Sequence, residues 1–550
     1  MFNHFKLLVA DPIEAEGVSA LSAAGILLDI RASLDEAALC EAIADANAVL
    51  VRSKTRVTAR ALDAAKHLRL VTRAGIGVDN VDVAAASRRG VIVSNVPDAT
   101  TTTTAELAIA LLCSLARHVP QADRNIRAGK YERNKFLGTE ICGKTLGIVG
   151  LGRIGKIVAD RALGLKMRVV AFDPFLPPGS ANAANTMPGV SIVDFDTLLA
   201  SSDFISLHTP LTDATKHLLN EKTLAKCKRG VRIINAARGG VIDESALCAA
   251  VKSGQVAGAA LDVTEIEPLP TNSELRNYEQ IILTPHLGAS TEEAQRRVAI
   301  EAAQQIIEFA KTGVARSAVN LTILPDDLRE EFSPYVELAE KLGLFAGQIL
   351  TNSSTGEPPA RVTRISLVFR GERFERTGGD RVTAALRAAL LAGLLKPTLD
   401  ETVSPVSAPM LARERGIEVL EAREPRDRDY LNRVDVEVTT ENNNCLRVSG
   451  TCFGRRPRFV EMDGVPLDAA LEGDLLVTRH DDKPGIVGRI GTDLGSRGVN
   501  LDRVDLGPIP GTHRAIGIFG ISTDLPDAAV TAARSLDGVI FACRVRLAKS

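Results

Sequence analysis

The sequence predicts an α/β protein that is organised around a doubly wound, parallel sheet and continues into a smaller α+β half. Strand-like apolar runs alternate with helical patterns over residues 1–97, and a strand, a glycine turn and a helix follow one another at residues 144–174. Residues 474–547 then follow the order β-α-β-β-α-β. A chain of 550 residues is too long for one core, so we expect several domains.

The first 97 residues predict a small layer of parallel strands with intervening helices. The expected strands are residues 7–10, 48–51, 70–72 and 91–94. Two of these strands end in cations: Arg52 is followed by Ser53, and Arg73 leads toward Gly75 and Ile76. Strand ends in open α/β sheets face ligands, so both arginines are candidates for binding an anionic substrate. A solvated strand-end arginine is the alternative interpretation of each.

The glycine turn after residues 146–149 predicts a dinucleotide site. Gly150, Gly152 and Gly155 allow close backbone approach, and the following helix would present its free N–H groups to a pyrophosphate. The spacing alone is a weak signal in a chain with 44 glycines. Asp173 strengthens it, because this residue lies about twenty positions past the glycines, at the end of a second strand, where a carboxylate can accept hydrogen bonds from ribose.

The segment between these two units contains a run of threonines at residues 100–104. With Glu106 three residues after Thr103, it predicts a capping box that opens a helix over residues 105–118. Residues 127–135 are polar and basic, which is typical of a crossing segment or a dimer contact.

Four further apolar runs predict strands, and each is followed by a polar segment. The runs are residues 204–207, 231–234, 259–263 and 281–283, and the polar segments begin at His208, Asn235, Glu265 and Thr284. The intervening helical patterns imply parallel strands, so all four polar segments should meet at one edge of the sheet. A nicotinamide ring would lie at that edge.

Three side chains at this edge fit hydride-transfer chemistry. His286 could accept or supply the proton on the substrate oxygen near neutral pH. Glu267 could hold the imidazolium form and raise the histidine pKa. Arg238 could bind a substrate carboxylate and polarise an adjacent carbonyl. Each residue alone has an ordinary surface explanation, but their common location at strand ends favours chemistry.

The composition favours small-molecule partners. A formal charge of −2, with acids and bases interspersed, argues against a nucleic-acid or membrane-surface protein. The eight cysteines form no C-x-x-C pair, so we expect buried thiols in a reducing compartment and no metal site. The longest apolar helical stretch, residues 105–116, is too short to span a bilayer, and no signal peptide is evident. We therefore expect a cytoplasmic protein.

The segments GLGRIG, NAARGG, ALDVTEIEP and TPHLGAST together resemble those of the D-isomer-specific 2-hydroxyacid dehydrogenases. The resemblance implies a Rossmann-type, NAD-binding domain over residues 98–289. This domain would be inserted in a flavodoxin-like substrate domain that comprises residues 1–97 and a return segment at residues 290–318.

By this resemblance Arg238, Glu267 and His286 form the catalytic set, and NAD is the cofactor. The positions that match cofactor contacts are Gly150, Gly152, Arg153, Ile154, Gly155, Asp173, His208, Thr209, Pro210, Ala236, Ala237, Arg238, Asp262, His286 and Gly288. Those that match substrate contacts are Arg52, Ser53, Arg73, Gly75 and Ile76, together with Arg133, which would come from a partner subunit. One departure affects the substrate region: Ala99 and Thr100 stand where the family commonly has Gly-Asn.

The tail resembles the long-form branch of this family. Residues 319–470 would be an intervening regulatory domain, and residues 471–550 a ferredoxin-like ACT domain, which is an amino-acid-sensing module. That branch implies oxidation of D-3-phosphoglycerate to 3-phosphohydroxypyruvate, the first step of L-serine biosynthesis, in a homo-oligomer, either a dimer or a tetramer. It also implies feedback by L-serine, with contacts from His480 and Asp482 on a loop and from Asn500 at the start of the second strand.

Two other functions stay open. A glyoxylate or hydroxypyruvate reductase belongs to the same class, although the long tail disfavours it. Corepressors related to these dehydrogenases keep the same three catalytic residues and serve as non-catalytic, dinucleotide-sensing scaffolds, although an ACT-like tail speaks against that role.

Overall fold

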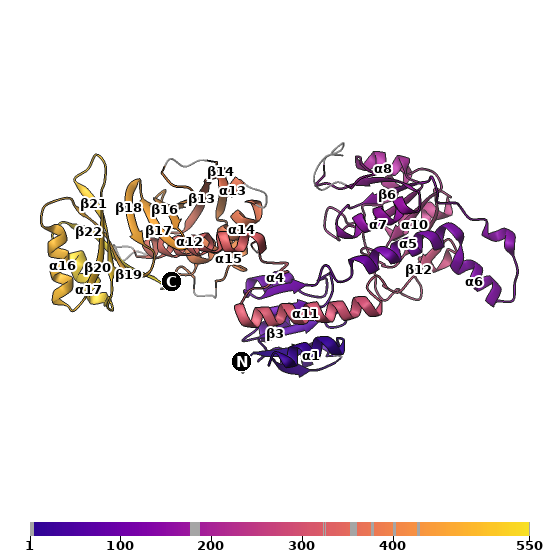
Figure 1. Ribbon diagram of the computed structural model, residues 1–550, viewed down its shortest axis with the longest axis horizontal. Helices are drawn as coiled ribbons and strands as arrows, with labels where there is room; N and C mark the ends of the chain where they lie inside the picture. Colours follow the sequence, from indigo (N-terminus) through magenta and orange to yellow (C-terminus); the bar gives the residue numbers. More distant parts are fainter. Residues whose placement is uncertain are drawn as a thin grey trace.

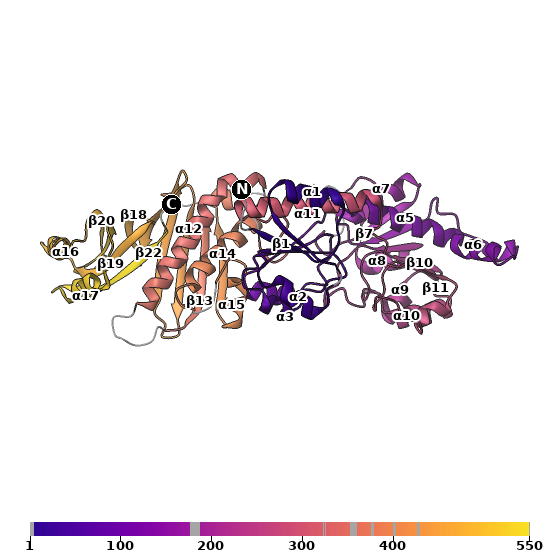
Figure 2. The same cartoon turned by 90° about the horizontal axis from the view of Figure 1, so that it is seen from below.

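The computed structural model describes residues 5–32, 34–176, 187–322, 324, 326–352, 360–375, 379–399, 403–425 and 429–548. These residues form four sheets that lie in a row, with the N-terminal five-stranded sheet between a seven-stranded sheet and the C-terminal half (Figures 1 and 2). The predicted fold class is confirmed: two parallel α/β sheets precede two sheets of mixed or antiparallel strands.

The five-stranded sheet is parallel and has the order β2-β1-β3-β4-β5, which is the flavodoxin-like order. Its strands are β1 (Lys6–Val9), β2 (Leu27–Ile30), β3 (Ala48–Val51), β4 (Leu70–Arg73) and β5 (Ile92–Asn95), and its helices are α1 (Ala15–Ala23), α2 (Glu36–Ile43), α3 (Ala59–Ala64) and α4 (Val83–Arg88). The sequence predicted four of these strands. It missed β2, an edge strand with two half-exposed ends, because an exposed edge lacks the continuous apolar run of a buried parallel strand.

The seven-stranded sheet is also parallel, with the order β12-β11-β10-β9-β6-β7-β8. Its strands are β6 (Thr145–Val149), β7 (Arg168–Phe172), β8 (Val190–Ile192), β9 (Phe204–Leu207), β10 (Val231–Asn235), β11 (Val256–Leu261) and β12 (Ile281–Leu283), and its helices include α7 (Arg153–Gly164), α8 (Phe195–Ser201), α9 (Glu221–Lys226) and α10 (Glu244–Lys252), with the 3-10 turn η2 (Glu274–Asn277) before β12. The direction of winding reverses between β6 and β9. Ligands bind at such a switch point, outside the carboxyl ends of the strands.

Helix α5 (Thr101–Arg117) leads from the first sheet to the second and packs against α7. The predicted capping box is wrong: the helix begins at Thr101, and its N-cap residue, Thr100, makes no side-chain cap bond. The threonines lie inside the helix because their hydroxyls can bond back to the preceding turn. Thr104 does so, donating to the Thr100 carbonyl (3.0 Å), and it also lies 2.9 Å from the Gly288 carbonyl oxygen, on the loop after β12.

Helix α11 (Glu292–Thr312) returns the chain to the first sheet, where it packs against α1. Ala318 then pairs with Ser94, and the Asn320 side chain accepts from the Val93 N–H (2.8 Å) and donates to the Val91 carbonyl (2.9 Å). The first sheet is thus completed by residues more than 200 positions downstream of β5. Between α5 and β6, helix α6 (Val119–Arg127) and the 3-10 turn η1 (Arg133–Phe136) form an arm that projects from the seven-stranded unit (Figure 1).

The C-terminal half contains a six-stranded sheet of order β14-β13-β15-β16-β17-β18 and a four-stranded antiparallel sheet of order β20-β21-β19-β22. The first comprises α12 (Asp326–Thr351), β13 (Val362–Arg370), α13 (Glu372–Glu375), α14 (Gly379–Leu395), α15 (Ala408–Glu414), β14 (Glu418–Glu424), β15 (Arg433–Thr440), β16 (Cys445–Phe453), β17 (Arg456–Met462) and β18 (Val465–Ala470). The second comprises β19 (Gly473–Asp481), α16 (Ile486–Ser496), β20 (Leu501–Pro508), β21 (Arg514–Ile521), α17 (Asp527–Ser535) and β22 (Val539–Leu547), which is the predicted β-α-β-β-α-β order.

One apolar core underlies both C-terminal sheets. Buried side chains of α12, including Leu342 and Phe345, belong to the same cluster as Val477 and Ile518 of the four-stranded sheet. Few contacts join this half to the N-terminal sheet: α15 meets α4, where Arg88 Nε lies 3.5 Å from a Glu414 carboxylate oxygen.

The sequence also made predictions about the cysteines, membrane spans and metal sites. All eight cysteines are free, but the expectation of buried thiols is wrong for two exposed ones: Cys142 lies in the turn before β6, and Cys445 is the first residue of β16. Within the described residues, no helix is long and apolar enough to cross a membrane, and no cluster of three or more His, Cys, Asp or Glu side chains could hold a metal ion.

Candidate active site

The glycine turn between β6 and α7 is closely packed. Gly150 has a φ of +94°, and a Cβ there would lie 2.6 Å from the His208 carbonyl oxygen. A Cβ at Gly155 would lie 2.1 Å from the Gly150 carbonyl oxygen, so α7 can approach the turn only with glycine at this position. A Cβ at Gly152 would meet no described atom within 4 Å. The turn is therefore open on the side where the N–H groups of the first turn of α7, which begins at Arg153, have no intrahelical partner and can bind an anion.

Asp173 follows β7 at the same edge. Its Oδ2 accepts a hydrogen bond from the Leu151 N–H (3.0 Å), and its Oδ1 accepts one from the Phe175 N–H (3.0 Å). The carboxylate thus holds the glycine turn in place, and its oxygens can each accept a further bond. This placement fits the predicted contact with ribose.

Two buried polar atoms after β9 also fit a dinucleotide. His208 Nδ1 and Thr209 Oγ1 have no hydrogen-bond partner among the described residues. Burial lowers the pKa of His208 to about 4, so its ring is neutral, and its Nε2 lies 2.9 Å from Ser206 Oγ. Buried polar groups in proteins are normally hydrogen-bonded. The orphaned atoms, next to Pro210 and across from Gly150, therefore indicate a polar ligand at the switch point.

Arg238 lies in the loop after β10. The buried Asn235 shapes this loop, because its amide donates to the Arg238 carbonyl (2.9 Å) and its Oδ1 accepts from the Ala237 N–H (3.0 Å). The arginine side chain reaches toward the N-terminal sheet, where its Nε lies 3.2 Å from Asp79 Oδ2. A Cβ at Gly77 would lie 2.0 Å from Arg238 Nη2, so glycine is required for this approach. Arg238 therefore joins the two parallel sheets.

His286 and Glu267 form the predicted pair. His286 Nδ1 lies 2.7 Å from Glu267 Oε2, and Glu267 Oε1 accepts from the Thr264 N–H (3.2 Å). The hydrogen bond to Glu267 raises the pKa of His286 above its ordinary value. Burial acts to raise the pKa of Glu267, but the bond to His286 and its positive charge outweigh burial, and the net shift is downward. The pair is thus poised to stabilise an imidazolium that forms when the ring takes up a proton.

The buried carboxylate of Asp262 fixes the loop that carries His286. Asp262 Oδ1 accepts from the Thr284 hydroxyl (2.6 Å) and the Leu287 N–H (2.7 Å), while Oδ2 accepts from the Gly288 N–H (2.9 Å). His286 itself has a φ of +55°, an uncommon conformation for a non-glycine residue, which these bonds help to hold. The resemblance implied a cofactor contact for Asp262. Within the described chain its hydrogen bonds go to this loop.

Three arginines converge between the two parallel sheets. Burial lowers the pKa of Arg73 to about 10, and the positive charges of Arg238 and Arg52 contribute to this shift. Arg73 Nε is buried and has no hydrogen-bond partner in the described part of the chain. A Cβ at Gly75 would lie 1.6 Å from Arg73 Nη1, so the guanidinium lies directly over this glycine. Arg52 donates to Gln295 Oε1, on the N-terminal turn of α11, and to the Pro12 carbonyl (3.3 Å). Such a cluster of three cations, one of them largely desolvated, favours an anionic ligand.

Not every predicted substrate residue lies in this cluster. Ile76 contributes its carbonyl to a bond from the Asn95 side chain (2.6 Å), and Ser53 follows Arg52 at the end of β3. Arg133 is exposed in η1, on the arm, and the arm projects away from the N-terminal sheet in both views (Figures 1 and 2). The described chain therefore does not bring Arg133 together with Arg52 and Arg73.

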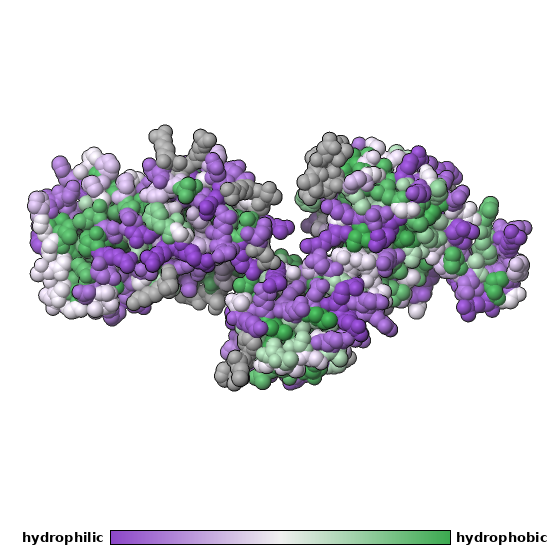
Figure 3. All heavy atoms as spheres, viewed as in Figure 1, coloured by the Kyte–Doolittle hydropathy of each residue, from purple (hydrophilic) through white to green (hydrophobic). Residues whose placement is uncertain are grey.

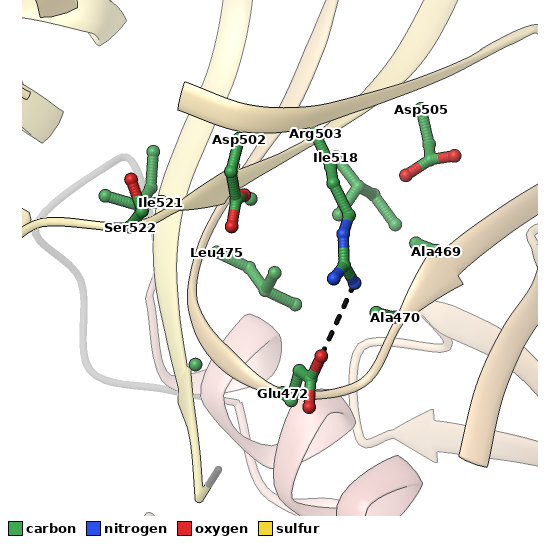
Figure 4. Close-up of a pocket in the computed structure, with 12 residues that line it drawn as sticks. Ala469, Ala470, Glu472, Leu475, Asp502, Arg503, Asp505, Ile518, Ile521 and Ser522 are labelled. Carbon is green, nitrogen blue, oxygen red and sulfur yellow. Dashed lines mark hydrogen bonds and ion pairs between the residues drawn. The ribbon is translucent and has the colours of Figure 1, made fainter. Parts of the chain in front are cut away.

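One of the three predicted regulatory residues is placed differently from expectation. His480 does not lie on a loop: it belongs to β19, is 1% exposed, and its Nδ1 lies 3.0 Å from Thr478 Oγ1, because the strand runs to Asp481 and turns this side chain inward. Asp482 is exposed, and the Asn500 side chain donates to Ser522 Oγ (2.7 Å). A cavity of about 300 Å³ lies nearby, between β18, the start of β19, β20 and β21, and Arg503 points across it to Glu472 (Figure 4). His480, Asp482 and Asn500 do not line this cavity.

Sequence reasoning assigned no role to Asp79, Gln295 or the Asn235 side chain. Asp79 and Asn235 do occur in polar segments that follow predicted strands. Nothing in their spacing, however, showed that Asp79 would meet an arginine more than 150 residues away. Such contacts depend on how the two sheets face one another.

The chain matches known proteins over nearly its whole length. The model of the D-isomer-specific 2-hydroxyacid dehydrogenase NAD-binding domain matches residues 109–288, and that of the D-3-phosphoglycerate dehydrogenase intervening domain matches residues 331–463. A D-3-phosphoglycerate dehydrogenase of Synechocystis is 38% identical over 546 residues, covering 99% of this chain and 95% of that protein. The protein of the same name from Bacillus subtilis is 38% identical over 529 residues, covering 96% of each.

Solved structures of similar proteins cover a little over half of the chain. A glyoxylate reductase from Paecilomyes thermophila is 33% identical with a TM-score of 0.53, covering 57% of this chain and 98% of that one. An NAD-dependent formate dehydrogenase from Staphylococcus aureus, solved with NAD, is 27% identical with a TM-score of 0.51, covering 57% of this chain and all of the other. The motifs, the two parallel sheets and the full-length similarity together show that the chain belongs to the D-3-phosphoglycerate dehydrogenases of the D-isomer-specific 2-hydroxyacid dehydrogenase family, with NAD as its cofactor.

Proposed function

We propose that this protein oxidises D-3-phosphoglycerate to 3-phosphohydroxypyruvate with NAD, the first step of L-serine biosynthesis. The observation that carries the proposal is the His286–Glu267 hydrogen bond of 2.7 Å at the sheet edge where Arg238 also lies. The arginine cluster supplies a positive pole for a substrate that carries both a carboxylate and a phosphate. The full-length relatives from Synechocystis and Bacillus subtilis carry the corresponding name.

In the proposed mechanism, the arginines bind the charged groups of the substrate and the His286–Glu267 pair handles its hydroxyl proton. Arg238 binds the carboxylate and polarises the oxygen that becomes a carbonyl, while Arg52 and Arg73 attract the phosphate. His286 removes the hydroxyl proton, and Glu267 stabilises the resulting imidazolium. NAD, held by the glycine turn and Asp173, supplies the hydride acceptor when it is bound.

A glyoxylate or hydroxypyruvate reductase is the second candidate, because a solved glyoxylate reductase is 33% identical over the shared region. A panel assay separates the candidates: NADH formation is measured with D-3-phosphoglycerate and with glycerate and glycolate, which lack the phosphate. A phosphate-independent rate would favour the reductase. No turnover of any substrate would favour a non-catalytic dinucleotide sensor.

We further propose a cytoplasmic homo-oligomer that associates through the arm. Tyr131 and Leu137 on the arm are 85% and 88% exposed, and Val119 and Ile126 of α6 are also more than half exposed. Apolar residues lie among polar ones on this part of the surface (Figure 3). A partner subunit would cover them and could bring Arg133 to the neighbouring substrate site.

The proposed domains are residues 1–97 together with residues 290–318, residues 98–289, residues 319–470 and residues 471–550.

His286→Ala is expected to lower kcat by at least ~10²-fold while NAD affinity stays close to that of the wild type, because only the proton-transfer group is lost. Steady-state kinetics and NAD titration measure both effects. His67→Ala, which removes an exposed histidine, is the control. Wild-type turnover in the His286 variant would exclude this histidine from the mechanism.

The pH dependence should reveal the His286–Glu267 pair. Oxidation requires neutral His286, so kcat rises as the pH passes through the His286 pKa, which the bond to Glu267 raises. Glu267→Gln removes the negative charge and lowers that pKa, so the midpoint of the rise should move to lower pH while maximal kcat falls by ~10-fold or more. A pH–rate series compares this variant with Glu140→Gln, a change at an exposed acid. An unmoved midpoint would show that Glu267 does not set the basicity of His286.

The cofactor preference should follow from Asp173. Its carboxylate lies against the glycine turn, 3.0 Å from the Leu151 nitrogen, and would repel a 2′-phosphate. We expect kcat/KM to be at least ~10²-fold higher with NAD than with NADP. Comparable values for the two cofactors would count against this role of Asp173.

L-Serine is the proposed effector of the C-terminal domain. It should slow the intact enzyme, and Asn500→Ala should weaken this response without changing uninhibited turnover, because Asn500 is exposed and directly precedes β20, which lies at the opposite end of the molecule from β12 (Figure 1). Inhibition curves for both proteins test this. If calorimetry finds no serine binding to the intact enzyme at millimolar concentration, the regulatory role fails while the catalytic proposal stands.

A further inference from the structure

The loop that carries Arg238 and the loop that carries Glu267 touch each other through their backbones. A Cβ at Gly239 would lie 1.9 Å from the Thr264 carbonyl oxygen, so no side chain separates the two loops. Thr264 in turn donates its N–H to Glu267 and its hydroxyl to the Ile266 carbonyl (2.9 Å). A shift of the Thr264–Ile266 segment would therefore move the Glu267 carboxylate.

Two glutamates clamp this segment by reciprocal hydrogen bonds. Glu244, the first residue of α10, accepts from the Glu265 N–H through Oε1 (2.7 Å), and Glu265 accepts from the Glu244 N–H through its own Oε1 (3.3 Å). The same Glu265 oxygen lies 3.2 Å from His217 Nε2, and the His217 N–H donates to the Gly240 carbonyl (2.8 Å). We call Glu244, Glu265 and His217 the glutamate clamp. It contacts the Glu267 loop and the Arg238 loop at once.

The clamp brings the carboxylates of Glu244 and Glu265 together. Their mutual repulsion costs folding free energy, which suggests that the arrangement serves a purpose other than stability. Burial raises the pKa of Glu244, and the charge of Glu265 raises it further. Asp243, the N-cap of α10, adds a third carboxylate beside His217. The positive end of the α10 dipole partly offsets this repulsion. Stability alone does not require this arrangement, since α10 already has a capping side chain in Asp243.

We propose that the glutamate clamp is a positioning device that holds the Glu267 carboxylate at hydrogen-bond distance from His286. This inference rests on the proposed roles of His286 and Glu267. The clamp residues do not touch substrate or cofactor. They act through the 264–267 segment, whose anchored conformation aims one Glu267 oxygen at His286 and the other at the Thr264 N–H. The clamp thereby raises the pKa of His286, a residue that it does not contact.

The basicity of His286 reports on this positioning. The charged groups that face His286 are Glu267 and Asp262, which raise its pKa, and Arg238, which lowers it. Asp262 is anchored by its own loop bonds, independently of the clamp. Loosening the clamp should therefore weaken mainly the Glu267 contribution and lower the His286 pKa.

The test uses the full-length enzyme with D-3-phosphoglycerate and NAD. Glu265→Ala should lower kcat by ~10-fold or more, since a displacement of ~1 Å can cost up to ~10²-fold, and should move the midpoint of the pH–rate curve to lower pH. The KM for NAD should stay within ~2-fold, because the glycine turn is untouched. Glu265→Gln should restore most of kcat and the midpoint, because the amide oxygen can still accept from the Glu244 N–H.

Glu221→Ala is the matched control. Glu221 is the first residue of α9, as Glu244 is of α10, but its exposed side chain forms no hydrogen bond or ion pair with any residue that the structure describes. It should show wild-type kcat and midpoint. If Glu265→Ala does not fold, Glu244→Ala removes the other half of the clamp and takes its place, with the same expected result.

Two outcomes would overturn the proposal. One is wild-type kcat and midpoint in the clamp variants, and the other is a lower kcat with an unmoved midpoint, which would indicate general loosening of the fold. Failure of the catalytic proposal looks different, since His286→Ala would then turn over like the wild type. An inactive His286→Ala together with an unmoved midpoint in Glu265→Ala would reject the clamp alone.

Discussion

The parallel direction of the seven strands is the constraint on which the candidate chemistry depends. It places the residues after β6, β7, β9, β10, β11 and β12 at one edge, although they are spread over more than 100 positions of the chain. Two buried side chains then fix the loops that carry the proposed catalytic residues. The Asn235 amide holds the Arg238 loop, and the Asp262 carboxylate holds the His286 loop. The side chains that carry out the proposed chemistry are thus aimed by neighbours that never meet the substrate.

The charge distribution across this edge is uneven in a way that suits the proposed reaction. Arg73 is held in a buried site next to two other arginines, with one donor unpaired among the described residues, and this arrangement disfavours its charged form. An anionic substrate would relieve that penalty on binding. Opposite this positive pole, the Glu267 carboxylate supports a proton on His286. In the proposed mechanism the two anionic ends of the substrate therefore meet the arginines, while the hydroxyl between them meets the His286–Glu267 pair.

The sequence predicted the features that depend on local pattern. Strands β3, β9 and β12 lie at the expected residues, because each is a compact apolar run bounded by turn residues. The His286–Glu267 contact was also predictable, since both residues follow parallel strands. The threonine run at α5 and the inward turn of His480 were not, because each depends on a distant surface: a loop after β12 in one case, and the helices over the four-stranded sheet in the other. The glutamate clamp joins the start of α10 to two separate loops and has no local signature in the sequence.

The common core beneath the two C-terminal sheets has a mechanical consequence. Leu342 and Phe345 of α12 pack in the same cluster as Val477 and Ile518, so no soft layer lies between the six-stranded and four-stranded sheets. Contact with the N-terminal unit is, by contrast, small in the described part of the chain, and it includes the junction of α4 with α15, where Arg88 meets Glu414. A displacement of the four-stranded sheet would therefore be transmitted through the six-stranded sheet without deformation of the core between them. The C-terminal half would rotate as a rigid body about that junction. A small movement of the four-stranded sheet would then change the angle between this half and the substrate-binding sheet, and not the shape of either.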